Sequence, residues 1–574
     1  YTVWLVPFRG DFQATLQAWS QRLRFDASPS VQPAVSPTGA ALAETDEVLV
    51  WHEVPSRKAL GQEAPPPRKA AGVRLAAAQG EYEPFQLVIR GKEQMPYTRL
   101  ERMEIEVADL KRQGGGEIAS GNVTCAVAEF VDLRYPKGLG WSGHTPDALP
   151  EARRFACEPG RNTILWITVK VPRETPPGLY DGSIHLHHGL GRRRARLATV
   201  PLQVRVFGFA IPEERHFSAW LPFSSRLGIA QMYEGKDAKA IYDRYVRNYV
   251  EHRAGLRFVS PSVRFKGGSA EIEQIHLKPF EDDLRHHFDD LRMPHVNCRS
   301  FNIGASHELT PNYFGKPDEV LSPLWRARYR RLAKVIGDWL REKQWQDRVI
   351  FELFDEPVEE HIPILAECLK MLKAEFPDIR VTYAAMWVDP RLCGLVNVWM
   401  TGGGYAHIPL QKRRAAGDTL WFGNNNHASV DRLAAEFRLT WWRYWLDGIA
   451  GCNHWHVGEC NDWLRKGKWD RNRIATWLLP GEDGPINTIR WELTREGLED
   501  YEYLWLLHHA VQNAKAAGAD ATDGERALAR VNELVIRKGR SLRFNPDPAL
   551  LHDVRDSLGA QIEKLARFLP AQAK

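Results

Sequence analysis

The chain has 574 residues, of which 44% are hydrophobic, and a formal net charge of +5 from 77 basic and 72 acidic side chains. This composition is typical of a globular protein with a large core, and it excludes a disordered or collagen-like chain. The near balance of charge argues against a protein that binds nucleic-acid phosphates or an anionic membrane surface. No apolar run reaches the roughly 18 residues of a membrane-spanning helix.

Residues 1–210 are predicted to form two segments. Residues 1–45 open with a strand-like and an amphipathic stretch and continue into a Pro-, Ser- and Ala-rich linker, so we expect an N-terminal appendage there. Residues 46–210 contain short alternating runs separated by Gly and Pro, which predict an all-β sandwich. Its clearest strands are expected at 48–54, 84–90, 162–171, 182–188 and 195–209.

From residue 211 to residue 495, strands alternate with helices, which predicts a (β/α)8 TIM-like catalytic barrel. Residues 496–574 have helical periodicity with charged faces, and we expect a C-terminal helical region packed on the barrel. The expected barrel strands are 217–223, 256–263, 296–303, 348–354, 379–387, 396–402, 418–425 and 448–457.

The best candidates for catalysis follow the fourth predicted barrel strand, where FELFDEP places Asp355 and Glu356 side by side. Chemistry in such barrels takes place at the carboxyl ends of the strands, where the βα loops converge. We therefore expect both residues to be catalytic, with Glu356 as the general acid and base. The alternative is that one of them only caps the helix that follows.

Most glycoside hydrolysis needs two carboxylates on opposite sides of the scissile bond. The other acids at predicted strand ends are Asp389 and Glu459. A lone adjacent pair fits substrate-assisted hydrolysis better: a 2-acetamido oxygen attacks the anomeric carbon, Asp355 stabilises the acetamido N–H, and Glu356 protonates the leaving oxygen. The alternatives are Glu356 acting with Asp389 or Glu459 on another sugar, or a non-catalytic carbohydrate-binding protein.

Several aromatic and amide side chains at predicted strand ends are candidates for substrate binding. The chain has 21 Trp residues, and indole faces stack on sugar rings, although a large core would account for them equally well. The candidates are Trp387, Tyr405, Trp421, Asn424, Asn425 and Trp455.

We expect no metal and no cofactor. His454 and His456 lie on one face of the eighth predicted strand and could bind a metal together with Glu459, but hydrogen bonding or packing is the preferred interpretation. The seven cysteines include no CxxC pair, which argues against a cysteine zinc site or a disulfide framework.

Four segments together resemble glycoside hydrolase family 123 and the wider group of proteins with the same catalytic domain. They are AQGEYEPFQLVIR at 78–90, FDEP at 354–357, RLTWWRYWLDGIAGCNHW at 438–455 and PINTIRWELTREGLEDYEYLWLL at 485–507. The resemblance implies a β-sandwich, a barrel and a retaining β-N-acetylgalactosaminidase that works by substrate assistance. The family's Asp-Glu pair corresponds to Asp355 and Glu356.

The resemblance also implies an oligosaccharide or glycoconjugate substrate and favours a secreted or periplasmic enzyme, although no signal peptide is visible. The Asn run at 424–426 departs from the family pattern at the end of the seventh predicted strand, where the resemblance implies an aromatic residue. The fourth segment has a structural interpretation of its own. Its acidic and basic residues, Arg490, Glu492, Arg495, Glu499 and Asp500, are expected to form a buried ion network that holds the helix in place.

Overall fold

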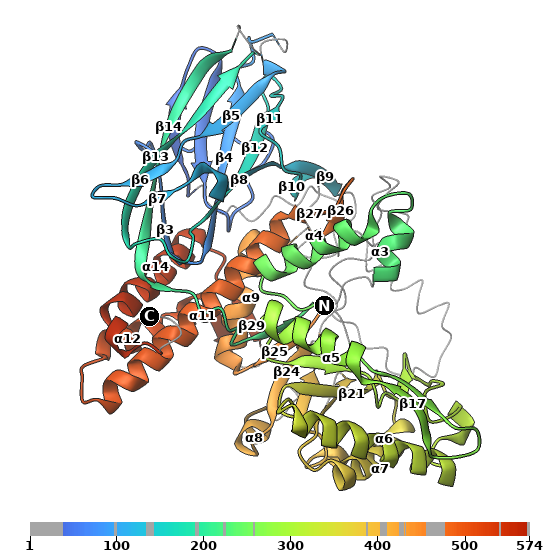
Figure 1. Ribbon diagram of the computed structural model, residues 1–574. Helices are drawn as coiled ribbons and strands as arrows, with labels where there is room; N and C mark the ends of the chain where they lie inside the picture. Colours follow the sequence, from blue (N-terminus) through green and yellow to red (C-terminus); the bar gives the residue numbers. More distant parts are fainter. Residues whose placement is uncertain are drawn as a thin grey trace, which may run out of the picture.

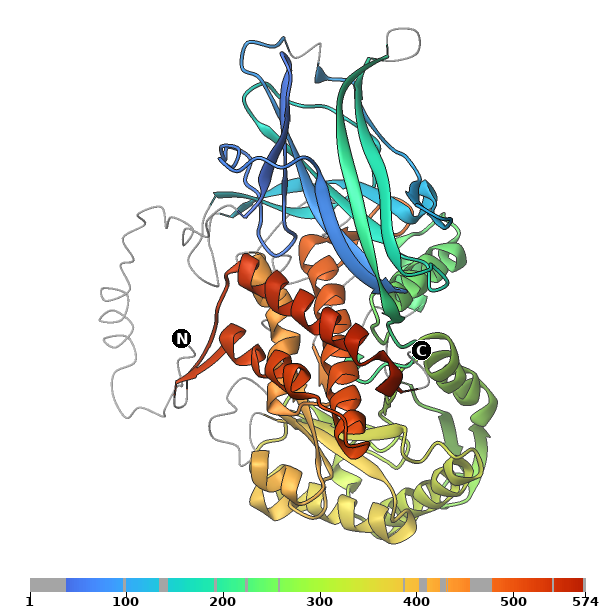
Figure 2. The same ribbon diagram turned by 90° about the vertical axis from the view of Figure 1, so that its left-hand side faces the viewer.

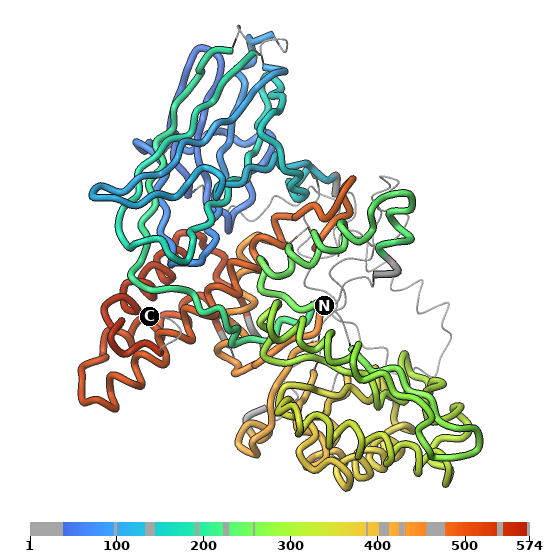
Figure 3. The backbone as a smooth tube through the Cα atoms, viewed as in Figure 1, coloured from blue at the N-terminus to red at the C-terminus, as the bar shows by residue number. Residues whose placement is uncertain are grey.

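The computed structural model shows a β-sandwich, a barrel and a set of C-terminal helices (Figures 1 and 2). The chain runs from the sandwich into the barrel and then back, so that the last helices lie beside the sandwich (Figure 3). The structure describes residues 38–96, 100–133, 143–189, 194–221, 226–256, 259–385, 388–401, 410–423, 430, 432–454, 477–538 and 541–570.

The sandwich consists of a five-stranded and a seven-stranded sheet that enclose one apolar core. The first sheet has the order β1 (Ala40–Glu44), β2 (Val48–Glu53), β4 (Tyr82–Gly91), β12 (Asn162–Lys170) and β8 (Val123–Val127). The second has the order β11 (Arg154–Phe155), β5 (Met103–Val107), β13 (Gly178–His188), β14 (Ala195–Ala210) and β3 (Val73–Gln79). Its other two strands are β6 (Leu110–Arg112), which pairs with β13, and β7 (Glu117–Ile118), which pairs with β6. This confirms the predicted sandwich.

The sandwich begins earlier than residue 46. Strand β1 pairs antiparallel with β2, so residues 40–44 are the edge of a sheet and not a linker. Their Ala-rich sequence has little β-propensity, and the pairing with β2 provides what the residues themselves lack. Residues 1–37 of the predicted appendage lie outside the described residues.

A ring of parallel strands forms the barrel. Strands β15 (Ser218–Trp220), β25 (Gly451–Asn453), β24 (Thr419–Gly423), β23 (Val398–Thr401), β22 (Arg380–Ala385), β21 (Val349–Asp355) and β18 (Val296–Cys298) pair in that order. Parallel bridges from Trp220 to Gly255 and from Val259 to Cys298 close the ring. The predicted TIM-like barrel is therefore confirmed. Seven of the expected strands have a counterpart in the sheet, and the one expected at 256–263 is represented by the bridges at Gly255 and Val259.

Helices cover the outside of the barrel. They are α3 (Arg226–Met232), α4 (Ala238–Glu251), α5 (Leu277–Arg285), α6 (Pro323–Glu342), α7 (His361–Glu375), α8 (Leu410–Ala415) and α9 (Ala434–Asp447). Local sequence sets their starts: Asp237 caps α4, and Ser322 caps α6, which has Pro323 in its first turn. Short elements fill the connections of the barrel: η3 (His286–Asp290), η4 (Pro317–Glu319), η5 (Pro390–Leu392), β16 (Ser262–Phe265), β17 (Ile272–His276), β19 (Gly304–Ala305) and β20 (Glu308–Leu309). In the sandwich, η1 (Ser120–Asn122) connects β7 to β8.

The C-terminal region begins with the long helix α11 (Ile489–Ala516), so the predicted boundary at residue 495 falls inside one element. It continues with α12 (Thr522–Ala529), α13 (Val531–Leu534), the hairpin β28 (Val535–Lys538) and β29 (Ser541–Phe544), α14 (Pro548–Lys564) and η8 (Ala566–Phe568). A sheet of β26 (Leu479–Pro480), β27 (Pro485–Thr488), β10 (Gly143–Leu149) and β9 (Glu129–Leu133) joins this region to the sandwich. In the part of the chain described, no helix is long and apolar enough to cross a bilayer.

The first part of helix α11, residues 489–504, is buried on all sides between the sandwich and the barrel. Its first turns pack against the outer face of the first sheet, where Ile489 and Leu493 share an apolar cluster with Trp166. On another side, α11 approaches α9 so closely that a Cβ on Gly497 would lie 2.0 Å from Trp441 and 2.8 Å from the carbonyl oxygen of Arg438. A glycine is required there.

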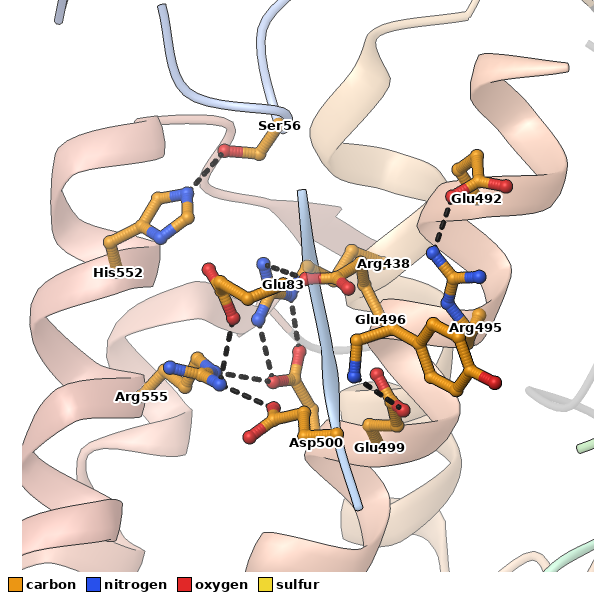
Figure 4. A network of polar contacts seen from close by, with 12 residues as sticks. Ser56, Glu83, Arg438, Glu492, Arg495, Glu496, Glu499, Asp500, His552 and Arg555 are labelled. Atoms are coloured by element: carbon orange, nitrogen blue, oxygen red, sulfur yellow. Dashed lines mark hydrogen bonds and ion pairs between the residues drawn. The ribbon is translucent and has the colours of Figure 1, made fainter. Parts of the chain in front are cut away.

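An ion network joins α11 to α9, α14 and β4, as predicted for the fourth segment (Figure 4). Arg438 of α9 pairs with Asp500 at 2.5 Å and with Glu496 at 3.1 Å. Arg555 of α14 pairs with Glu83 of β4 at 2.9 Å and with Asp500 at 3.6 Å. All of these side chains are essentially without exposed surface.

The network extends along α11 in both directions. Arg490 forms a bidentate pair with Asp147 of β10, at 2.8 and 2.6 Å, and Arg495 pairs with Glu492. Glu499 accepts a hydrogen bond from the backbone N–H of Tyr82. Each residue expected in the network is thus in a buried polar contact.

Carboxyl groups outnumber guanidinium groups around β4 in this network. Burial raises the pKa of Glu83 to about 7, because Arg555 only partly offsets the loss of hydration and the neighbouring Glu81 adds to the rise. A carboxyl whose pKa is raised on folding stabilises the folded state fully below its unfolded pKa, and this contribution is lost as the pH rises through the folded value.

We therefore predict that Glu83→Gln weakens the pH dependence of stability. Between pH 5 and pH 8 the free energy of unfolding of the unmodified protein should fall by about 1–3 kcal/mol more than that of the variant. Urea unfolding at both pH values measures the difference. Glu117→Gln, at an exposed position in β7, is the control and should behave as the unmodified protein does. Equal pH dependence in all three proteins would contradict the assignment.

Candidate active site

The candidate pair lies at the mouth of the barrel, at the carboxyl end of β21. The strand is buried from Val349 to Phe354, and Asp355 is its last residue. The side chain of Asp355 is 36% exposed and that of Glu356 is 53% exposed. Both carboxylates therefore emerge at the edge where a barrel accepts its ligands.

Glu356 has a left-handed backbone conformation, with φ of +57°, which is unusual for a residue with a side chain. Its N–H donates to the carbonyl of Ala384 on β22 at 2.9 Å, and its carbonyl accepts a hydrogen bond from Nδ1 of His307 at 2.8 Å. These bonds hold the strained conformation on both sides. Such strain typically occurs at functional sites.

His307 is a neighbour of the pair that sequence reasoning missed. It lies in the turn between β19 and β20, where Ser306 and His307 both have positive φ. Since Nδ1 donates to the carbonyl of Glu356, Nε2 is the atom that faces the Glu356 carboxylate, at 3.7 Å. The sequence around it, GASHELT, gives no signal beyond a possible hairpin.

Arg299 and Glu352 were also missed. Arg299 follows β18, and its guanidinium lies 2.6 Å from the carboxylate of Glu352 and 3.9 Å from that of Asp355. Glu352 is completely buried, and desolvation raises its pKa, while Arg299 acts in the opposite direction. A lone acid within the apolar run VIFELF was the available signal.

Asp389 is held in a structural arrangement. It caps η5, accepting from the backbone N–H of Arg391 at 2.8 Å, and its two oxygens pair with the Arg391 guanidinium at 2.9 and 2.6 Å. Its side chain is 6% exposed, and the hydrogen bonds from Arg391 lower its pKa. A carboxylate bound in this way is poorly placed to attack a sugar.

The burial of Trp421 does not support the prediction that this residue binds substrate. Its side chain is completely buried, and it packs over Gly451, where an added Cβ would lie 2.5 Å from the indole. Its ring also meets that of His295 edge to face, at 6.3 Å between centroids. A side chain without exposed surface cannot stack on a ligand, so Trp421 belongs to the packed interior of the barrel.

The remaining predicted residues lie outside the part of the chain that the structure describes: Trp387, Tyr405, Asn424, Asn425, Trp455, His456 and Glu459. His454 is buried, and its Nε2 lies 3.2 Å from the hydroxyl of Tyr444, a hydrogen bond that agrees with the preferred interpretation. Among the described residues, no group of three or more His, Cys, Asp or Glu side chains could hold a metal ion.

Comparison with known protein families gives a match to part of the barrel and to helix α11. The sequence profile of the family described as glycoside hydrolase 123, catalytic domain, matches residues 310–507, which include Asp355 and Glu356. No curated protein sequence matches the chain.

Among solved structures, a family 123 glycoside hydrolase from Clostridium perfringens, studied for glycolipid glycan hydrolysis, is similar with a TM-score of 0.63 and 14% identity. The match covers 91% of this chain and 98% of that one, and it shows a shared fold. A glycosyl hydrolase family 2 member from Bacteroides cellulosilyticus matches with a TM-score of 0.25 and 11% identity over 76% of this chain and 50% of that one. An endo-1,4-β-mannanase from Rhizomucor miehei matches with a TM-score of 0.29 and 8% identity over 46% of this chain and 93% of that one. Both are too dissimilar to support a conclusion.

The backbone at Glu356 leads to a prediction about stability. Glu356→Gly should be more stable than Glu356→Ala by about 1 kcal/mol, because both variants lose the side chain and only glycine adopts positive φ without strain. Thermal or urea unfolding of the two variants measures the difference. The opposite order, which is usual for these two residues in regular structure, would show that residue 356 does not have the left-handed conformation.

Proposed function

We propose that this chain, whose residues 310–507 match the catalytic domain of glycoside hydrolase family 123, is a retaining exo-β-N-acetylgalactosaminidase that works by substrate assistance. The substrate is the non-reducing 2-acetamido sugar of an oligosaccharide or glycoconjugate. The observation that carries the proposal is the adjacent pair Asp355 and Glu356 at the mouth of the barrel, together with the engagement of Asp389 by Arg391.

In the proposed first step, the acetamido carbonyl oxygen of the bound sugar attacks the anomeric carbon. Glu356 transfers its proton to the glycosidic oxygen as the bond to the aglycone breaks. Positive charge develops on the acetamido nitrogen, and the carboxylate of Asp355 accepts a hydrogen bond from this N–H and stabilises the charge. The product is a bicyclic oxazolinium ion.

In the second step, Glu356 is a carboxylate and acts as a general base. It takes a proton from water as the water oxygen attacks the anomeric carbon, and the acetamido group is released. Two displacements leave the β configuration unchanged. His307 supports both steps, since its hydrogen bond to the carbonyl of Glu356 keeps the carboxylate aimed at the mouth.

The first test is the substitution of Glu356. Glu356→Gln should lower kcat on 4-nitrophenyl N-acetyl-β-galactosaminide by about 10²-fold or more, the usual contribution of general acid and base catalysis. Glu360→Gln, a nearby exposed carboxylate just before α7, is the matched control and should retain full activity. Equal activity of the two variants would remove Glu356 from the mechanism.

The second test separates substrate assistance from a protein nucleophile. A thiazoline analogue of the oxazolinium ion should inhibit far more strongly than substrate binds, because it resembles the high-energy state. Asp355→Asn should impair turnover, whereas Asp389→Asn should mainly lower stability, since it disrupts the pair with Arg391. An enzyme that ignores the thiazoline, cleaves sugars without the acetamido group equally well and loses turnover in Asp389→Asn or Glu459→Gln uses two carboxylates.

A further inference from the structure

Glu352 lies inside the barrel, beneath the catalytic pair. It is the register partner of Thr382 on β22, and the side chain of Phe351 next to it packs on Phe376 in the helical layer. Because successive side chains of a strand point to opposite faces, Glu352 points into the barrel. Asn297 of β18 pairs with Ile350, two residues before Glu352, and faces the interior as well, so both strands contribute a polar side chain to the buried layer beneath the mouth.

Arg299 connects this buried layer to the mouth. Its backbone N–H donates to the hydroxyl of Ser260 at 3.2 Å, which fixes the start of the loop after β18. Its side chain is 31% exposed. Its guanidinium lies 2.6 Å from the carboxylate of the fully buried Glu352 and 3.9 Å from that of the partly exposed Asp355. One guanidinium thus lies between two carboxylates of the same strand.

Stability alone does not account for this arrangement. A buried carboxylate loses its hydration, and a buried ion pair is on average no more stabilising than apolar residues of similar size. The rise in the pKa of Glu352 has the same origin, namely desolvation with an added contribution from Asp355. The pair of Glu352 and Arg299 holds a cation in a fixed position. This cation lies next to the adjacent carboxylates of Asp355 and Glu356, which would otherwise repel each other.

We propose that Glu352 and Arg299 are positioning residues for catalysis: Glu352 anchors the guanidinium of Arg299, and Arg299 holds the carboxylate of Asp355 in place and compensates its charge. This inference rests on the proposed role of Asp355 in accepting the acetamido N–H. Arg299 acts through Asp355 and does not touch the reacting atoms.

The experiment measures kcat and KM on 4-nitrophenyl N-acetyl-β-galactosaminide for Glu352→Gln, Arg299→Met and Arg299→Lys, with unfolding curves for each. We expect Glu352→Gln and Arg299→Met to lower kcat by about tenfold to a hundredfold, the scale at which misplacement of a catalytic group acts, with little change in KM. Arg299→Lys should recover part of the loss, because it keeps the cation. Thr382→Val, which changes the neighbour of Glu352 without removing a charge, is the control and should retain kcat.

The decisive comparison repeats Arg299→Met in an Asp355→Asn background. If Arg299 acts through Asp355, the second substitution should cause little further loss of kcat. A loss as large as in the native background, or unchanged kcat in a folded Glu352→Gln variant, would overturn the proposal. Failure of the proposed function is a separate observation: the unmodified enzyme then does not cleave the acetamido glycoside, and the same variants are compared on the glycoside that it does cleave.

Discussion

The burial of helix α11 is the constraint on which the rest of the architecture depends. Residues 489–504 of the helix carry charges on several sides and are all buried, so each of these charges needs a partner. Arg438 of α9, Arg555 of α14 and Asp147 of β10 supply these partners, and they come from the barrel, the C-terminal region and the sandwich connection. Three parts of the chain are therefore fixed around one helix.

The same network is connected through the barrel to β21, the strand that ends at Asp355. Helix α9, which contributes Arg438, precedes β25, and β25 pairs with β15 and β24 in the ring. The closed ring in turn gives β21 a neighbour on each side, with β18 in register at Cys298 and Phe351 and β22 at Glu352 and Thr382. This ladder can hold two features that are costly in isolation, the buried charge of Glu352 and the left-handed backbone of Glu356.

The sequence predicts the elements of this structure better than their contacts. The barrel strands are recognisable because buried parallel strands are short apolar runs, and the position of FDEP after one of them is enough to identify Asp355 and Glu356 as candidates. Trp421 shows what is missing: an apolar run does not reveal which residues point into a packed barrel interior. The approach of Arg299 to Glu352 depends on the register of β18 against β21, which no local pattern contains. The β1 edge strand was missed because its pairing with β2 overrides a weak propensity.

The four segments that resemble glycoside hydrolase family 123 differ in what they indicate about the substrate. AQGEYEPFQLVIR supplies Glu83, the segment at 438–455 supplies Arg438, and the segment at 485–507 supplies Asp500, so all three contribute to the ion network. Similarity in these three segments therefore indicates a shared scaffold and not a shared substrate. Of the four segments, only FDEP contains the two proposed catalytic residues, and an Asp-Glu pair does not by itself distinguish one 2-acetamido sugar from another.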